Sequence, residues 1–225
     1  MTNINNDLQS ISVPAVRSTA TLSSAGSASL EAHDVVTLSD HLLLRAWGGG
    51  GASAATSTQR PQRRSTLGHN VTDASGLVIV PNFGHVDNNF RGGRPTDAGI
   101  DYLQQHGVRS ILDLENDPNA VAHERDRAKK DGLNFYSVPM SANHHPSDAT
   151  LSQALGVLNN PANGPVYTHC YQGEDRTGLV EALERVHNGW TPAAAYDEMV
   201  NFGSGLLPHM VGTFRAKTGF TPPQQ

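Results

Sequence analysis

The residues of this chain that are best suited to chemistry lie at positions 165–178, in the stretch PVYTHCYQGEDRTG. An apolar pair leads to His169 and Cys170, and Cys170 is the only cysteine of the chain. Arg176 follows after a short polar segment, and the apolar pattern LVEALERV comes next. This order predicts a strand that ends at the cysteine, a tight loop, and a helix that begins near the arginine.

The predicted loop combines an anion site with a nucleophile. Backbone N–H groups at the start of a helix converge on an anion, and the same field lowers the pKa of a nearby thiol and yields a thiolate. Gly173 lets the loop bend, Arg176 can bind two oxygens of a tetrahedral oxyanion, and Thr177 offers a hydroxyl to the sulfur. The alternative is a buried and inert Cys170, because free cysteine is among the most buried residue types.

Six positions of this stretch resemble the signature HCxxGxxR[ST]G of the cysteine-dependent phosphatases. The matching residues are His169, Cys170, Gly173, Arg176, Thr177 and Gly178. The segments NFGHVDNNFRGGRP, GVRSILDL and LNFYSVPM are similar to the N-terminal half of atypical dual-specificity phosphatases, of the plant and fungal type and their bacterial relatives. The resemblance covers residues 80–205 and leaves the first 75 residues unexplained.

The resemblance implies hydrolysis of a phosphomonoester in two steps, without a metal or a cofactor. Cys170 would attack phosphorus and form a phosphocysteine, a general acid would protonate the leaving oxygen, and water would then release phosphate. His169 and Thr177 would support the loop. The phosphate oxygens would be held by the loop residues Tyr171, Gln172, Gly173, Glu174, Asp175 and Arg176.

The general acid is absent from its usual place in this family, the loop that here reads VPMSANHHPSD. Asp175 is the first candidate to replace it, and the alternative for this side chain is a solvated acid that braces Arg176. Asp148 is the second candidate, and its alternative is a helix N-cap, a position at which Asp is common. His144 and His145 could donate protons near neutral pH, although paired histidines are more often surface residues.

The charges of the loop favour phosphotyrosine or another monophosphate as substrate. The loop has no lysine, and Glu174 and Asp175 repel a polyanion at short range. Arg91 and Arg94, on a turn that the family places near the pocket, could restore positive charge or form an ordinary exposed turn. We therefore expect a protein tyrosine or dual-specificity phosphatase. The alternatives are an inositol phosphate or phosphoinositide phosphatase and a non-catalytic phosphate-binding module.

The composition separates a polar N-terminal arm from the part that can form a core. Among the first 75 residues, 20 are Ser or Thr and one, Trp47, is aromatic. We predict that residues 1–75 are largely disordered, with an amphipathic pattern at 29–47 and a Gly-rich linker at 48–66, and that residues 76–220 form the catalytic domain. Alternating strand and helix signals predict an α/β fold with a central, mostly parallel sheet of four or five strands flanked by helices.

Charge, cysteine content and hydropathy restrict the possible partners and the cellular compartment of the protein. The net charge of −5 and the pI of about 6.1 argue against nucleic acid as a partner. A single cysteine excludes an internal disulfide and fits a reducing compartment. There is neither an apolar run of about 20 residues for a membrane span nor an ordinary secretory signal. We expect a cytoplasmic monomer that acts on a phosphorylated protein or a small phosphorylated metabolite; a secreted effector delivered to a host cell is the alternative.

Overall fold

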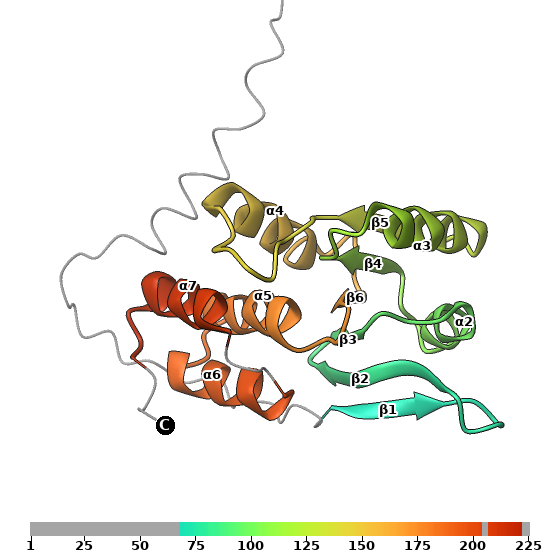
Figure 1. Ribbon diagram of the computed structural model, residues 1–225, viewed down its shortest axis with the longest axis horizontal. Coiled ribbons are helices and arrows are strands. Elements are labelled where there is room, and N and C mark those ends of the chain that lie inside the picture. The colour runs from blue at the N-terminus through green and yellow to red at the C-terminus, as the bar shows by residue number, and fades with distance from the viewer. Residues whose placement is uncertain (1–67, 204–206, 222–225) are drawn as a thin grey trace, which may run out of the picture. The chain divides into compact units, whose positions relative to one another are not determined.

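The computed structural model describes residues 68–203 and 207–221, whose arrangement is shown in Figure 1. Six strands form one mixed sheet: β1 (His69–Thr72), β2 (Val78–Val86), β3 (Asn89–Gly93), β4 (Ser110–Asp113), β5 (Asn134–Ser137) and β6 (Val166–Cys170). The helices in the described part of the chain are α2 (Asp97–Gln105), α3 (Pro118–Lys130), α4 (Asp148–Leu158), α5 (Asp175–His187), α6 (Pro192–Asn201) and α7 (Pro208–Thr218).

The sheet has the strand order β1-β2-β3-β6-β4-β5. The pairs β1–β2 and β2–β3 are antiparallel, whereas β3, β6, β4 and β5 pair in parallel. Gly93 is the register partner of Cys170, and Asp113 is the partner of His169, so the central strands end at one edge. This carboxyl edge is where parallel α/β sheets bind their ligands.

Helices cover both faces of the sheet, with α2 and α3 on one face and α4 to α7 on the other (Figure 1). The two cores follow the alternation of side chains along the buried strands. Ile111 and Tyr167 belong to the core beneath α2 and α3, while Leu112 and Val166 belong to the core beneath α4, α5, α6 and α7. The central strands are thus buried on both sides and give the loop after β6 a rigid base.

The predicted α/β fold with a mostly parallel sheet is confirmed, but the sheet has six strands rather than four or five. The additional strand, β1, lies before the predicted boundary at residues 75 and 76. Its sequence HNVT is mostly exposed and has no apolar pattern, and it is held by backbone pairing with β2. Between β2 and β3 the chain turns at residues 87 and 88, with a positive φ of 54° at Asp87.

Capping residues mark the starts of four helices. The side chains of Thr96, Asp117, Ser147 and Thr191 each accept a hydrogen bond from a backbone N–H in the first turn. The amphipathic pattern at 29–47 and the Gly-rich linker lie outside the described residues. None of the described helices combines the length and the apolar content needed to cross a membrane.

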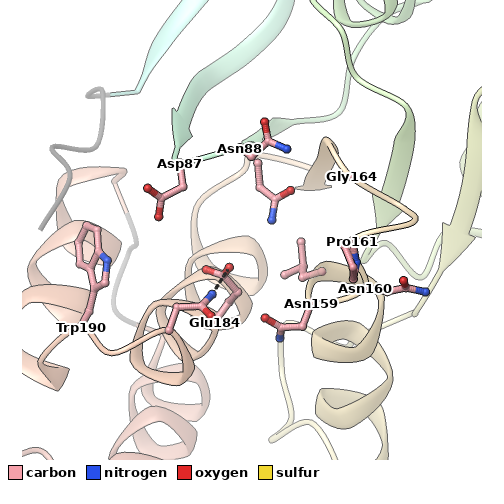
Figure 2. Close-up of a pocket in the computed structure, with 11 residues that line it drawn as sticks. Asp87, Asn88, Asn159, Asn160, Pro161, Gly164, Glu184 and Trp190 are labelled. Atoms are coloured by element: carbon pink, nitrogen blue, oxygen red, sulfur yellow. Dashed lines mark hydrogen bonds between the residues drawn. The ribbon is translucent and has the colours of Figure 1, made fainter. Parts of the chain in front are cut away.

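A cavity of about 670 Å³ lies near the start of β3 and β6, at the sheet edge opposite the carboxyl ends of the central strands (Figure 2). Its lining includes Asp87 and Asn88 from the turn before β3, and Glu184 and Asn188 from the end of α5. Because Cys170 lies at the other end of β6, this cavity is separate from the predicted site.

Candidate active site

The loop between Cys170 and Arg176 joins a strand to a helix, as predicted. Cys170 is the last residue of β6, and Arg176 is the second residue of α5. Gly173 has a φ of 75°, and a Cβ added there would lie 2.2 Å from the carbonyl carbon of Gly92. The loop therefore packs against β3 so closely that only glycine fits at this position.

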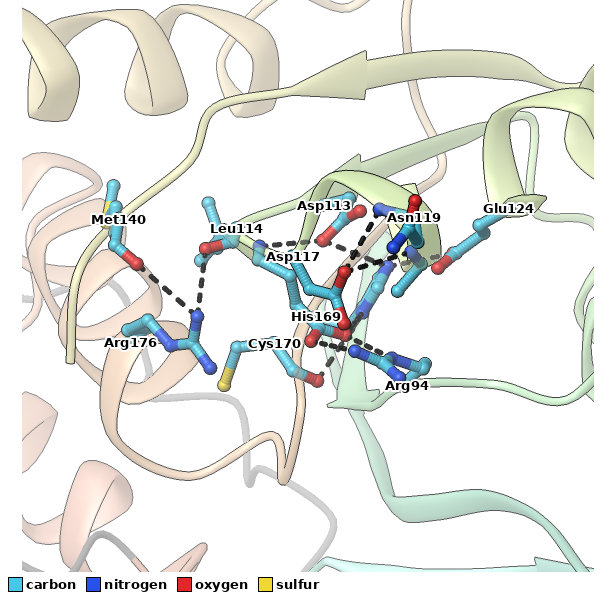
Figure 3. Close-up of polar contacts among 12 residues, drawn as sticks. Arg94, Asp113, Leu114, Asp117, Asn119, Glu124, Met140, His169, Cys170 and Arg176 are labelled. Carbon is cyan, nitrogen blue, oxygen red and sulfur yellow. Dashed lines mark hydrogen bonds and ion pairs between the residues drawn. The ribbon is translucent and has the colours of Figure 1, made fainter. Parts of the chain in front are cut away.

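The guanidinium of Arg176 is held beside the sulfur of Cys170 (Figure 3). Its Nη1 donates hydrogen bonds to the carbonyl oxygens of Leu114 and Met140, each at 3.3 Å. These two residues follow β4 and β5, so the carboxyl ends of two further strands fix the guanidinium. A thiol and a fixed guanidinium thus meet at the start of a helix, which is an arrangement suited to a tetrahedral oxyanion.

The two arginines of the predicted turn have different surroundings. Arg91 is fully buried and donates through Nη2 to the carbonyl oxygen of Gly173 at 3.1 Å, so it is neither exposed nor a charge in the pocket. Arg94 is half-buried, forms a two-pronged ion pair with Glu115, and lies 5.1 Å from the ring of Tyr171. Only Arg94 therefore brings a guanidinium to the rim of the loop, and a carboxylate already faces it.

His169 lies within a cluster of buried carboxylates on the other side of Cys170 (Figure 3). Its Nε2 is 2.8 Å from Oε1 of Glu124 and 3.8 Å from Oδ1 of Asp113, and its Nδ1 is 4.0 Å from Oε1 of Glu115. Burial opposes protonation of the ring, but Glu124 and the other two carboxylates outweigh it and raise the pKa of His169 to about 9. The residue before the cysteine is therefore a cation at neutral pH.

The remaining loop residues divide into an exposed rim and a buried base. Tyr171 and Gln172 are exposed, and Glu174 is half-buried, where burial and the neighbouring Asp175 raise the pKa of its carboxyl. Thr177 is fully buried, and its Oγ1 makes no hydrogen bond within the described part of the chain. The structure thus records no hydrogen bond from the Thr177 hydroxyl to the sulfur of Cys170.

A family model described as "DSP-PTPase phosphatase fused to NAD+ Kinase" matches residues 82–205, which is more than half of the chain. The chain belongs to the DSP-PTPase phosphatase family. The matched segment begins in β2 and ends after α6, so it contains the cysteine, the arginine and all four parallel strands. The prediction of a cysteine-dependent phosphatase is confirmed at the level of the family.

Some relatives of this DSP-PTPase chain are named inositol diphosphatases, and others are named tyrosine-protein phosphatases. Inositol diphosphatase DSP4 of Arabidopsis thaliana is 31% identical over 137 residues, which cover 57% of this chain and 68% of the relative. OCA1 of Mycosarcoma maydis, whose name proposes a tyrosine-protein phosphatase, is 31% identical over 135 residues. These residues cover 57% of this chain and 84% of OCA1.

A solved structure gives the same fold. The catalytic core of Siw14 has a TM-score of 0.51 and 26% identity with this chain, and the match covers 62% of this chain and 84% of that core. Full-length SIW14 of Saccharomyces cerevisiae, named an inositol diphosphatase, is 32% identical over 146 residues. The chain spans only half the length of that protein.

The two aspartates predicted as general acids lie at the starts of different helices in this phosphatase. Asp175 is the first residue of α5, half-buried, and directly precedes Arg176. Asp148 is the first residue of α4, with a side chain that is 81% exposed and 2.5 Å from Nζ of Lys217. The N-cap of α4 is Ser147, so the alternative role predicted for Asp148 is wrong. Of the two aspartates, only Asp175 borders the phosphatase loop.

The paired histidines belong to the loop that precedes α4. Nδ1 of His144 is 3.0 Å from Oγ of Ser141. Nδ1 of His145 is 2.9 Å from Oγ1 of Thr213, and its ring meets that of His209 edge-on at 5.4 Å. His145 is thus tied to α7, and the structure gives neither histidine a contact with Cys170 or Arg176.

Three buried acids around His169 were not predicted as site residues, although the sequence holds a signal for each. Asp113 and Glu115 alternate with leucines in the segment SILDLE, at the end of a buried strand. Glu124 lies on the apolar stripe of α3 with Val121 and Ala128, where a carboxylate needs a partner. The partner, His169, is distant in the chain, so the pairing depends on the strand order.

The same acids form a group whose geometry could suit a metal ion. One donor atom each from Asp113, Glu115 and His169 lie within 4.8 Å of one another. However, the carboxylate of Glu115 already binds the guanidinium of Arg94, and His169 is itself a cation at neutral pH. These charges oppose the binding of a further cation, and a reaction without a metal remains our prediction.

Raising the pH from 7 to 9 is expected to reduce the free energy of unfolding by about 2 kcal/mol through His169 alone. The pKa of His169 is raised to about 9 in the folded chain, so its stabilisation is complete below the unfolded value of 6.5 and is lost as the pH rises through 9. Urea unfolding at both pH values would measure the loss. In a Glu124→Gln protein the loss should be smaller, and equal losses in the two proteins would contradict this assignment.

Proposed function

We propose that this chain hydrolyses phosphoric monoesters through a phosphocysteine at Cys170. The observation that carries the proposal is the guanidinium of Arg176, which two carbonyl oxygens hold beside the sulfur at the start of α5. The start of α5 presents free backbone N–H groups to an anion bound beside the sulfur. The chain thus combines a nucleophile with fixed donors for the charge that develops on phosphorus.

In the first step, the thiolate of Cys170 attacks phosphorus, an S–P bond forms, and the P–O bond to the leaving group breaks. The leaving oxygen takes a proton from a general acid, while Arg176 and the N–H groups of residues 171–176 bind the other phosphate oxygens. In the second step, water attacks phosphorus, gives a proton to the conjugate base of that acid, and breaks the S–P bond. Inorganic phosphate leaves, and the thiolate is restored.

We assign the general acid to Asp175, because it borders the loop, whereas Asp148 is engaged by Lys217 on an exposed surface. An Asp175→Asn protein is expected to lose about 10²-fold in kcat and to show a flatter basic limb in its pH profile, since the proton donor is lost. Asp148→Asn is the matched control and should change kcat by less than about twofold. A large effect of Asp148→Asn with none of Asp175→Asn would reverse the assignment.

For the substrate we propose a phosphotyrosine or other monophosphate group of a protein or metabolite. The rim offers the exposed ring of Tyr171 as a surface for an aromatic leaving group. The guanidinium of Arg94 already faces Glu115, and Glu174 and Asp175 add negative charge beside the loop. A substrate with few phosphates is repelled least by these acids.

A second candidate is the hydrolysis of an inositol diphosphate. It is supported by the names of the relatives from Arabidopsis and Saccharomyces, each more than 30% identical to this chain. Here the exposed face of Arg94 would meet a further phosphate, since its planar guanidinium suits such a group.

One panel tests both candidates. The native chain and a Cys170→Ser protein would be assayed with phosphotyrosine peptides, soluble inositol phosphates and inositol diphosphates, with free phosphate as the readout. We expect a kcat/KM for phosphotyrosine peptides above that for the inositol compounds. The reverse order would select the second candidate, and binding of all the compounds without turnover would point to a non-catalytic module.

A further inference from the structure

A buried arginine lies beneath the phosphatase loop. Arg91, on β3, is fully buried, and its Nη2 donates to the carbonyl oxygen of Gly173 at 3.1 Å. Nδ2 of Asn82, on β2, donates to the same oxygen at 3.3 Å. A carbonyl oxygen has two lone pairs, so side chains from two neighbouring strands fully occupy this acceptor.

Arg91 and Asn82 are both fixed by the C-terminal end of α6. Nη1 of Arg91 is 3.4 Å from Oε1 of Glu198, and its guanidinium lies over the ring of Phe202 at 3.9 Å. Asn82 also donates to the carbonyl oxygen of Phe202 at 2.8 Å. The second oxygen of Glu198 is 3.5 Å from Nε of Arg185, which is another buried arginine. These contacts leave the two donors to Gly173 little freedom to move.

This arrangement determines where one backbone N–H of the loop points. In a trans peptide the N–H is directed opposite to the C=O. Because Arg91 holds the C=O of Gly173 toward the protein interior, the N–H of Glu174 is directed away from the buried guanidinium, to the open side of the loop. If this peptide rotated, a carbonyl oxygen would face the bound phosphate in place of a donor and would repel it.

We propose that Arg91 is a positioning residue, which, with Asn82 as a second donor, fixes the peptide between Gly173 and Glu174 so that the loop presents an N–H group to an oxyanion. The proposal deepens the proposed function and rests on it, since the oxyanion is the phosphate of that reaction. Arg91 is fully buried, so its guanidinium would not reach a substrate bound at the open side of the loop. Its effect reaches the phosphate only through the peptide that it holds.

The first test compares the same substitution at two buried arginines. Arg91→Lys keeps a positive charge opposite Glu198, but lysine lacks the planar fork that reaches Glu198 and Gly173 together. We expect it to weaken the binding of tungstate, a phosphate-like oxyanion, by about 10- to 100-fold. Arg185→Lys is the control, because Arg185 shares Glu198 with Arg91, while its other ion pairs are with Glu181 and Glu184 of its own helix. It should lower Tm and change tungstate affinity less than about threefold.

A second variant keeps the test valid if Arg91→Lys fails to fold. Asn82 has a φ of 49°, which glycine adopts readily, so Asn82→Gly removes the amide and keeps the backbone. It should weaken tungstate binding about fivefold. If folded variants at both positions bind tungstate as the native chain does, the proposal is wrong.

The failure of this proposal can be distinguished from failure of the proposed function. Tungstate binding can be measured without turnover of a substrate. If the native chain hydrolyses no phosphoester but the variants still lose tungstate affinity, the proposed reaction is rejected and the positioning role stands. If the native chain is active and the variants match it in kcat/KM and tungstate affinity, the positioning role is rejected and the reaction stands.

Discussion

A Cys170→Ser protein is expected to hydrolyse an aryl phosphate at least about 10⁴-fold more slowly than the native chain. Serine fills nearly the same volume as cysteine at a position that is 3% exposed, so the fold should be kept. An alcohol is not ionised at neutral pH, whereas a thiolate is a strong nucleophile. The loss should therefore fall on kcat, which initial rates at saturating substrate would measure.

The control for this substitution is the binding of the product. Arg176 and the loop amides are unchanged in the Cys170→Ser protein, so its affinity for inorganic phosphate should stay within about threefold of the native value. Calorimetry would measure both affinities. If the variant kept more than a tenth of the native kcat, the thiolate mechanism would be excluded.

Arg176→Lys is expected to reduce kcat by about 10³-fold. The guanidinium uses Nη1 to bind the carbonyl oxygens of Leu114 and Met140, and its other nitrogens remain for the phosphate. Lysine carries the same charge on a single nitrogen, so it cannot keep both sets of contacts. The substitution retains the positive charge but loses contacts to the transition state. We therefore expect kcat/KM to fall as well.

Arg125→Lys provides the matched control, because Arg125 is an exposed residue of α3 and its guanidinium lies over the ring of Phe135 at 5.7 Å. This protein should retain native kcat and KM. An Arg176→Lys protein with native kinetics would show that charge alone is sufficient at this position, and that the tether to Leu114 and Met140 has no catalytic role.

The parts of the fold and site that follow local rules could be predicted from the sequence. Thr96, Asp117 and Thr191 mark helix starts because their side chains satisfy free N–H groups of the first turn. Gly173 and Arg176 follow from the spacing of a strand, a tight loop and a helix. The caps and the turn at Gly173, where φ is 75°, are local features, so their patterns are visible in the sequence.

The parts that depend on distant pairing could not be predicted. Arg91 and Arg94 flank the same glycines in RGGR, yet one is buried against Glu198 and the other pairs with Glu115. This difference depends on the packing of α6 beneath the loop, which one segment does not encode. Strand β1 was missed for a related reason, because an exposed edge strand has no apolar pattern and depends on backbone pairing.

The central claim is that phosphorus becomes bonded to the sulfur of Cys170 during turnover. The most direct measurement is an acid quench of the chain during steady-state hydrolysis of an aryl phosphate, followed by mass spectrometry of the peptide that contains Cys170. We predict one phosphoryl group on Cys170 in the native chain, and increased labelling if attack by water is slowed in Asp175→Asn. Active turnover with an unmodified Cys170 peptide, or with the phosphoryl group on another residue, would contradict the account.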